Sequence, residues 1–389
     1  MNLKDVKSIN ALCFVSMAAL GIYLSAYQSL VDSIKVSFLI DNTTIGFIIA
    51  LHFLGITILP LVTGEIGDRF GKKTVIMLGF VFFLTGLVMI IFAQIIVPLA
   101  IGILLVGAGF GIIEGMFTAM LVDTNAEPGK PIFLSQTFFC IGTVVGPFIA
   151  LLFNNVLNLS WKTNYIFVFA LILILFILFT RKGVNFKQNH PIGKKTLLTL
   201  QLIKKRLVIL LAVSLLLYVG VEEGIAFWIN DLFKQVQSAS YAGLFAISIY
   251  WGGMAVGRLV CSKINKHMRK IVLAGLVGSI AIAIIAIVFS NETVRMICFF
   301  FLGFGLSSIW PAIVFETNNR FPQYSGTVSG IMLFVSGVGG MMVPLLMGVV
   351  GDSMNMQAAF ILAPVIILII LCFQIVLVRK HKAYAEQKS

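Results

Sequence analysis

Twelve apolar runs, each about as long as a helix that crosses a lipid bilayer, dominate this sequence. About 20 consecutive apolar residues in helical conformation span the hydrocarbon core of a membrane, whereas a spanning β-barrel needs short alternating strands. The runs therefore predict an all-α membrane protein with twelve transmembrane helices in contact with a lipid bilayer. They cover roughly residues 9–31, 44–63, 74–94, 98–122, 132–154, 164–180, 207–229, 241–260, 271–289, 294–315, 327–350 and 357–378.

The distribution of charge agrees with a membrane protein. Hydrophobic residues make up 59% of the chain and charged residues 11%, a balance that excludes an ordinary water-soluble domain. The net charge of +13 does not indicate a nucleic-acid partner, because the basic residues lie in the short connections between runs. If the N-terminus is cytoplasmic, 24 of the 28 lysines and arginines fall at cytoplasmic ends or loops. We expect a multi-pass protein of a bacterial cell membrane, with both termini in the cytoplasm.

Several classes of function are unsupported by the sequence. The five cysteines are scattered without disulfide or metal-ligand spacing, and most lie in apolar runs where cysteine packs as a small hydrophobe. There is also no nucleotide-binding loop. We therefore predict no metal, no cofactor and no enzymatic activity.

The chain divides into two halves of similar pattern. The basic segment 181–206 predicts a cytoplasmic linker between an N-terminal six-helix bundle (1–180) and a C-terminal one (207–389). Gly109 recurs as Gly303 at an offset of 194, which would put Ser308 opposite Glu114. Such internal repeats predict two pseudo-symmetric bundles with a substrate site between them near the middle of the membrane.

The connection after the second run reads "GEIGDRFGKK" (64–73) and resembles the signature loop of the major facilitator superfamily. The resemblance implies the major facilitator fold, with this loop closing a cytoplasmic gate in which Arg69 pairs with an acid at the inner end of helix four. Asp123 stands at that place. The candidate gating residues are Gly64, Asp68, Arg69, Gly71 and Asp123. The alternative is that the charged ones are solvated residues at the membrane face.

Few acidic residues lie in or beside the apolar runs, and we expect no lysine or arginine deep in a helix to pair with them. A carboxyl group in a membrane usually faces a water-filled cavity, is often protonated and marks an ion or proton path. Glu114 lies well inside the fourth run, and Asp32 lies near the outer end of the first. Both are candidates for proton coupling, although Asp32 could be a loop residue and Glu114 a protonated carboxyl bonded to the backbone.

Short motifs along the chain resemble the fucose:proton symporter family of sugar permeases. They are "GAGFGIIE" ending at Glu114, Leu-Ser-Gln-Thr-Phe at 134–138, Tyr-Val-Gly-Val-Glu at 218–222, "YWGGMAVGR" at 250–258 and Trp310-Pro311. The family's Thr-Ala-Ala-Asn-Pro after the glutamate is absent. The resemblance implies proton-coupled symport of a monosaccharide by alternating access. Candidate contacts to this sugar-like solute are Gln136, Trp251, Trp310, Glu222 and His52, the last of which could instead be a neutral packing histidine.

A second resemblance keeps another function open. Gly142, Gly146 and Pro147 in the fifth run follow the helix-five pattern of drug:proton antiporters, so efflux of a drug or metabolite is the alternative. A sensor or binding protein that does not transport is a further alternative. Sodium could replace the proton, because carboxylates also bind sodium. We expect a monomer.

Overall fold

The computed structural model describes residues 3–181, 206–236, 242–264 and 268–386, and within these ranges the chain is helical with no β-strand. Twelve helical segments are long and apolar enough to cross a membrane, which confirms the predicted fold class. The predicted linker 181–206 lies almost wholly outside the described residues. The helices are α1 (Leu3–Phe38), α2 (Asn42–Phe70), α3 (Lys72–Phe92), α4 (Ile96–Thr124), α5 (Gly129–Leu151), α6 (Lys162–Arg181), α8 (Arg206–Val236), α9 (Ala242–Ser262), α10 (Met268–Val288), α11 (Glu292–Leu306), α12 (Ile309–Arg320), α13 (Ser325–Ser353), α14 (Met356–Phe360) and α15 (Leu362–Glu386).

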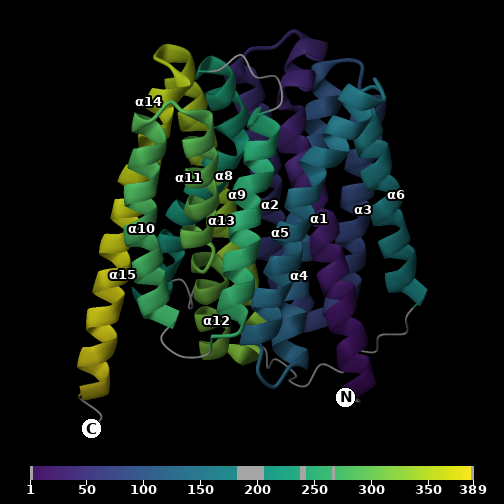
Figure 1. Ribbon diagram of the computed structural model, residues 1–389. Helices are drawn as coiled ribbons and strands as arrows, with labels where there is room; N and C mark the ends of the chain where they lie inside the picture. Colours follow the sequence, from purple (N-terminus) through teal and green to yellow (C-terminus); the bar gives the residue numbers. More distant parts are fainter. Residues whose placement is uncertain (1–2, 182–205, 237–241, 265–267, 387–389) are drawn as a thin grey trace.

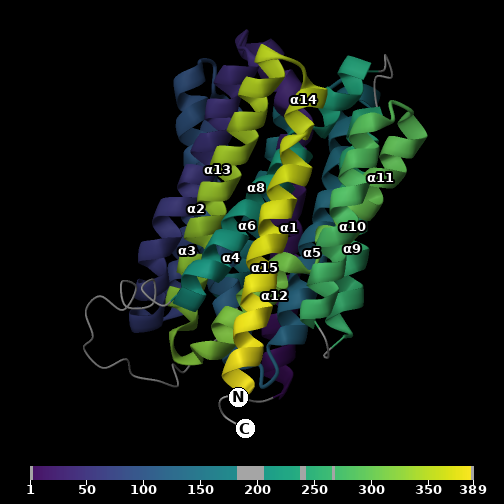
Figure 2. The ribbon, with the colours of Figure 1, turned by 90° about the vertical axis from the view of Figure 1, so that its left-hand side faces the viewer.

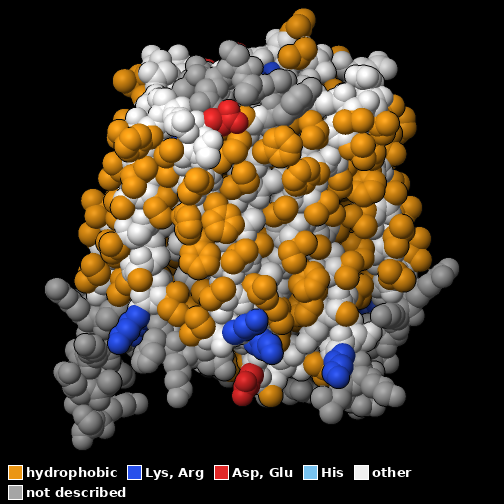
Figure 3. Space-filling view, viewed as in Figure 1, with side chains coloured by type: hydrophobic (Ala, Val, Ile, Leu, Met, Phe, Trp, Pro, Cys, Tyr) orange, Lys and Arg blue, Asp and Glu red, His pale blue; other side chains and the backbone are white. Residues whose placement is uncertain are grey.

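The helices stand side by side in two groups. In Figure 1, α1–α6 fill one side of the molecule and α8–α15 the other, with α2 beside α13 and α5 beside α9 at the junction. Figure 2 shows the same bundle turned by a quarter, with α15 crossing its full height. Apolar side chains cover the middle of the outer surface in Figure 3, and lysine and arginine side chains gather at its lower margin. We call the end that carries both termini the basic face, and the other end the upper face.

The fifth, tenth and twelfth spans are not single regular α-helices, and the twelfth is interrupted at Ile361 between α14 and α15. The fifth span continues from α5 into a π-helical turn, Leu152–Val156. The tenth span is broken between α11 and α12 at Ser307 and Ser308, three residues before Pro311. Proline has no backbone N–H, so the carbonyl four residues earlier loses its helical partner. That carbonyl belongs to Ser307, and it becomes available to another donor.

Glycines set the closest approaches of helices. A Cβ at Gly107 of α4 would meet the His52 carbonyl of α2, and a Cβ at Gly303 of α11 would meet the Tyr250 carbonyl of α9. Without a side chain, these backbones can pack directly against each other. The fourth and tenth spans are therefore held against equivalent neighbours in the two halves.

The same contacts correct the predicted repeat register. Gly107 and Gly303 make equivalent contacts, and so do Gly109 and Gly305, which pack against α3 and α10. Equivalent residues in these spans are thus 196 apart, and the predicted offset of 194 is wrong. The counterpart of Glu114 is Trp310 rather than Ser308. The glycine spacing alone gave the wrong offset. The Gly-Phe-Gly pattern of the tenth span matches the one at Gly109 by sequence, but by its helix contacts it matches the glycines two residues earlier, at Gly107 and Gly109.

Candidate functional site

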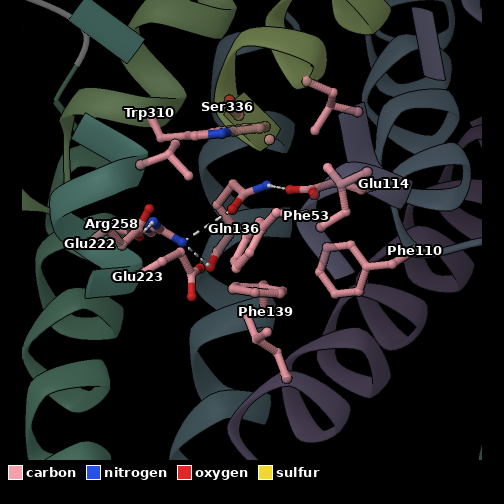
Figure 4. A pocket seen from close by; sticks show the side chains of 15 residues that line it. Phe53, Phe110, Glu114, Gln136, Phe139, Glu222, Glu223, Arg258, Trp310 and Ser336 are labelled. Carbon is pink, nitrogen blue, oxygen red and sulfur yellow. Dashed lines mark hydrogen bonds and ion pairs between the residues drawn. The ribbon is translucent and has the colours of Figure 1, made fainter. Parts of the chain in front are cut away.

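A small cavity lies between the two halves of the molecule. Its volume is about 50 Å³, enough for a few water molecules but far below the ~300–1,000 Å³ of typical ligand pockets. Aromatic and aliphatic side chains form most of its wall, including Phe53, Phe110 and Phe139 (Figure 4). Its ionisable and amide side chains come from both halves: Glu114 and Gln136 from α4 and α5, and Glu222, Glu223 and Arg258 from α8 and α9.

Arg258 corrects the expectation that no basic residue lies deep in a helix. Its side chain is 1% exposed, and its Nη2 donates to Glu222 Oε1 over 2.7 Å and to the Tyr218 hydroxyl over 3.4 Å. In the sequence, Arg258 ends the "YWGGMAVGR" motif and lies two residues before the end of the eighth apolar run, predicted over 241–260. The helix continues to Ser262, so Arg258 stays inside it. The position of Arg258 inside the predicted run was the signal that could have revealed the buried charge.

Arg258 also bridges the two halves. Its Nη1 donates to Gln136 Oε1 over 3.1 Å and to the Gln136 carbonyl over 3.3 Å, and it contacts Cys140 Sγ at 3.0 Å. Its Nε donates to the Ser307 carbonyl over 3.3 Å, which is the acceptor that Pro311 leaves free. A guanidinium has five donors in a planar fork, so one side chain can serve an acid, an amide and a carbonyl together.

Glu114 faces the cavity from α4 as the sequence suggested. Gln136 Nε2 donates to Glu114 Oε1 over 3.3 Å, and the same amide accepts from Arg258, so the side chains form a continuous chain from Glu222 to Glu114 (Figure 4). Among the ion pairs of the described residues, none involves Glu114. Glu114 is therefore a buried carboxyl without a cationic partner of its own.

The remaining predicted solute contacts, Trp310, Trp251 and His52, differ in whether they line the cavity. Trp310 lines it. Trp251 does not line the cavity but packs against Phe139, which does, with 5.9 Å between the ring centroids. Its Nε1 donates to Gln28 Oε1 over 3.1 Å. His52 does not line the cavity either: the ring is wholly buried behind Phe53 and beside Tyr23, whose hydroxyl lies 3.5 Å from His52 Nδ1. In this conformation His52 is therefore a buried ring outside the cavity lining.

The basic face is closed by a buried carboxylate. Asp68, at the end of α2, accepts from the backbone N–H groups of Gly326 and Thr327 over 2.9 and 2.7 Å. These donors belong to the first turn of α13, where N–H groups have no partner within the helix and the helix dipole favours an anion. Asp123 accepts from the Ser325 hydroxyl over 2.6 Å, which adds a second link between the halves.

Asp123 has a partner that the sequence did not predict. Lys72 Nζ lies 2.6 Å from Asp123 Oδ2 and 3.1 Å from Asp68 Oδ1, so this lysine joins the two acids. The side chain of Arg69, the expected partner, lies outside the described residues. The resemblance to the signature loop gave Lys72 no role, although it is one of the two basic residues that end the motif.

The two glycines of this loop have separate roles. A Cβ at Gly64 would lie 2.6 Å from the Gly326 carbonyl, so this position lets α2 and α13 touch. Gly71 has φ of 100°, a conformation that L side chains rarely adopt, and it forms the one-residue turn between α2 and α3. The sharp turn places Lys72 directly beside Asp68.

The upper face is closed by a different set of charges. Asp32 at the end of α1 pairs with Lys234 of α8, accepts from Asn230 Nδ2 over 3.0 Å, and lies 2.9 Å from Lys35 Nζ. Thr43 also donates to Asp352 over 2.9 Å, joining α2 to α13. Asp32 is thus held by two ammonium groups and is not among the residues that line the cavity.

No group of three or more His, Cys, Asp or Glu side chains in the described part of the chain is placed to hold a metal ion. The site therefore consists of a central network of carboxyl, amide and guanidinium groups, with closed contacts at both ends. Such an arrangement can bind a small polar solute between two halves that separate at one end or the other.

The chain belongs to the major facilitator superfamily, a family of transporters, whose model matches residues 10–344 and, in a second match, 266–389. Protein TsgA homologs of Buchnera aphidicola are 20% identical over 94% of this chain and 94% of theirs (subsp. Baizongia pistaciae), and 20% identical over 98% of both (subsp. Schizaphis graminum).

Solved structures share the fold. The fucose:proton symporter FucP in its outward conformation has a TM-score of 0.75 at 18% identity, covering 94% of this chain and 97% of that one. The human organic anion transporter MFSD10 has a TM-score of 0.77 at 13% identity, covering 95% and 99%. At these identities the similarity is evidence for the fold alone.

Proposed function

We propose that the protein is a secondary active transporter that moves a small polar solute, most simply a monosaccharide, together with protons. The observation that carries this proposal is Glu114: a carboxyl buried at the interface of the halves, hydrogen-bonded by Gln136, with no cationic partner among the described residues. An isolated ionised carboxylate is costly away from water, so such a group takes up a proton when the cavity closes and loses it when the cavity opens to water.

The side chains around the cavity suit a polyhydroxyl solute. Sugar hydroxyls both donate and accept, and here Gln136, Glu222 and Arg258 offer acceptors and donors together. Trp310 adds an aromatic face of the kind that stacks on the C–H side of a sugar ring. The cavity of about 50 Å³ is too small for such a solute, so loading requires the halves to part.

We place the protein in a cell membrane as a monomer, with the basic face and both termini in the cytoplasm. The lysines and arginines at the lower margin of Figure 3 support this orientation through the positive-inside rule. The two groups of helices, 1–180 and 207–389, then act as domains that rock about the central network.

Transport by proteoliposomes tests the proposal. A panel of radiolabelled monosaccharides is offered with and without a pH gradient of one unit. We expect one of them to accumulate only with the gradient, and Glu114→Gln to lower that accumulation at least tenfold while sparing counterflow. Glu127→Gln, at an exposed acid between α4 and α5, is the matched control and should behave as wild type. Unchanged accumulation in Glu114→Gln would remove the coupling role.

Efflux of a drug or metabolite by proton antiport is the second candidate. The apolar wall of the cavity, with Phe53, Phe110, Phe139 and Leu333, favours it, because such walls accept hydrophobic solutes. Dye efflux from cells that collapses with the proton gradient, without any response to sugars, would support antiport and sink the symport proposal.

A further inference from the structure

The central cavity contains more acids than bases. Three carboxyls line it, Glu114, Glu222 and Glu223, but Arg258 is the one guanidinium among the described lining residues. Arg258 is paired with Glu222 over 2.7 Å, which leaves Glu114 and Glu223 without a counter-charge. If both were ionised, the closed cavity would hold two uncompensated negative charges.

Glu223 is as buried as Glu114, and its surroundings are similar. It is 6% exposed and Glu114 is 8% exposed. Gln28 of α1 donates its Nε2 to Glu223 Oε2 over 3.1 Å, just as Gln136 donates to Glu114. The single oxygen of each amide accepts from the opposite half, from Trp251 for Gln28 and from Arg258 for Gln136.

The titratable and charged groups that face Glu223 do not neutralise it. Its own helix contributes Glu222, α4 contributes Glu114, and α9 contributes Tyr250 and Arg258. Two of these are acids, one is a phenol, and Arg258 is already bonded to Glu222. The amide of Gln28 can stabilise a carboxylate by one hydrogen bond, which does not offset the loss of hydration of a full charge.

Both ends of the molecule are closed around these groups. Asp68 is bonded to the first turn of α13 at the basic face, and Asp32 is paired with Lys234 at the upper face. The conformation that must form between the two open states therefore encloses Glu114 and Glu223 with space for only a few waters. Charge balance in this enclosed state requires one proton on each of the two carboxyls.

We infer that Glu223 is a second proton-carrying site, so that each half of the protein supplies one protonatable carboxyl and two protons move with each solute. This inference rests on the proposed proton-coupled transport. It also replaces Asp32, whose two ammonium neighbours keep it paired, as the second acid of the coupling mechanism. Each proton binds a carboxylate oxygen before the cavity closes, and it is released to water when the other end opens.

Infrared difference spectroscopy of the purified full-length protein tests the proton count without any solute. A protonated carboxyl has a C=O stretching band that a carboxylate lacks. We expect the wild-type band to lose about half of its cavity-derived intensity in Glu223→Gln, a similar share in Glu114→Gln, and all of it in the double variant. Glu223→Asp should keep a band at a shifted position, and Glu127→Gln should leave the spectrum unchanged. An unchanged band in Glu223→Gln overturns the inference.

Transport stoichiometry provides the second measurement. With the membrane potential clamped to zero, one pH unit supplies about tenfold accumulation per proton, so wild type should reach about 100-fold and Glu223→Gln about 10-fold. Counterflow by the variant shows that it is folded. A wild-type limit of about 10-fold, or an unchanged limit in Glu223→Gln, contradicts a second proton. If the infrared result holds but no gradient drives any sugar, the proposed function fails and the second proton site stands.

Discussion

The two closed ends of the molecule are held by contacts of different strength. At the basic face, Asp68 is 3% exposed and its carboxylate accepts backbone N–H groups at the start of α13. At the upper face, the side chain of Lys234 is 45% exposed and that of Asp32 is 25% exposed. One end uses a buried, charge-assisted set of hydrogen bonds, and the other uses ion pairs in contact with water.

This difference predicts which end opens more easily. Hydrogen bonds to a buried charged group contribute roughly 1.5–3 kcal/mol each, whereas exposed ion pairs contribute about 0–1 kcal/mol. The glycine contact between Gly64 and Gly326 further tightens the basic face. We therefore expect the empty protein to open more often at the upper face, toward the outside in the proposed orientation.

The largest effect is expected from Asp68→Asn. The asparagine amide keeps one acceptor oxygen but turns its NH₂ toward an N–H of α13, and it loses the ion pair with Lys72. Together these losses should weaken closure of the basic face by about 3 kcal/mol, which is roughly a hundredfold change in the ratio of closed to open protein. Spin labels at Lys130 and Asn319, both exposed at this face, should show a longer distance between the halves. An unchanged distance with normal transport would remove the gate assigned to Asp68.

A smaller effect is expected from Lys234→Met at the upper face. The variant removes one ammonium from Asp32 but leaves Lys35 and Asn230 in place. Closure of this end should weaken by less than about 1 kcal/mol, a few-fold change in the open fraction. Labels at Phe92 and Phe289, exposed on opposite halves of the upper face, would report it. A shift as large as that of Asp68→Asn would contradict the proposed difference.

Salt should produce the smallest change and act on one end only. Raising the ionic strength from about 0.1 M to about 1 M shortens the Debye length from about 10 Å to about 3 Å, which screens exposed charges far more than buried ones. The upper-face label distance should lengthen slightly, and the basic-face distance should stay constant. Lys234→Met should reduce the salt response. Equal responses at both ends would show that the two gates are alike.

The sequence predicted the elements and several residues of the site, but not their pairing. Apolar length and loop charge predicted twelve helices, and a lone acid in an apolar run drew attention to Glu114. The partner of Glu222 was missed, because Arg258 sits where a helix end and a loop look alike in sequence. The repeat offset was wrong by two residues, since glycine spacing does not show which neighbouring helix each glycine contacts.

Hydrophobicity, charge placement and short motifs determined the fold class and the membrane topology to expect, because both depend on local transfer free energies that add along the chain. Tertiary structure alone decided which acids gain a partner from another helix. Asp32 lies just after the first apolar run, one helical turn from Lys35, and Glu223 lies inside the seventh run. Helix packing brings Lys234 beside Asp32 and the amide of Gln28 beside Glu223, and Coulomb interactions at a few ångströms then distinguish the proposed gate from the proposed proton site.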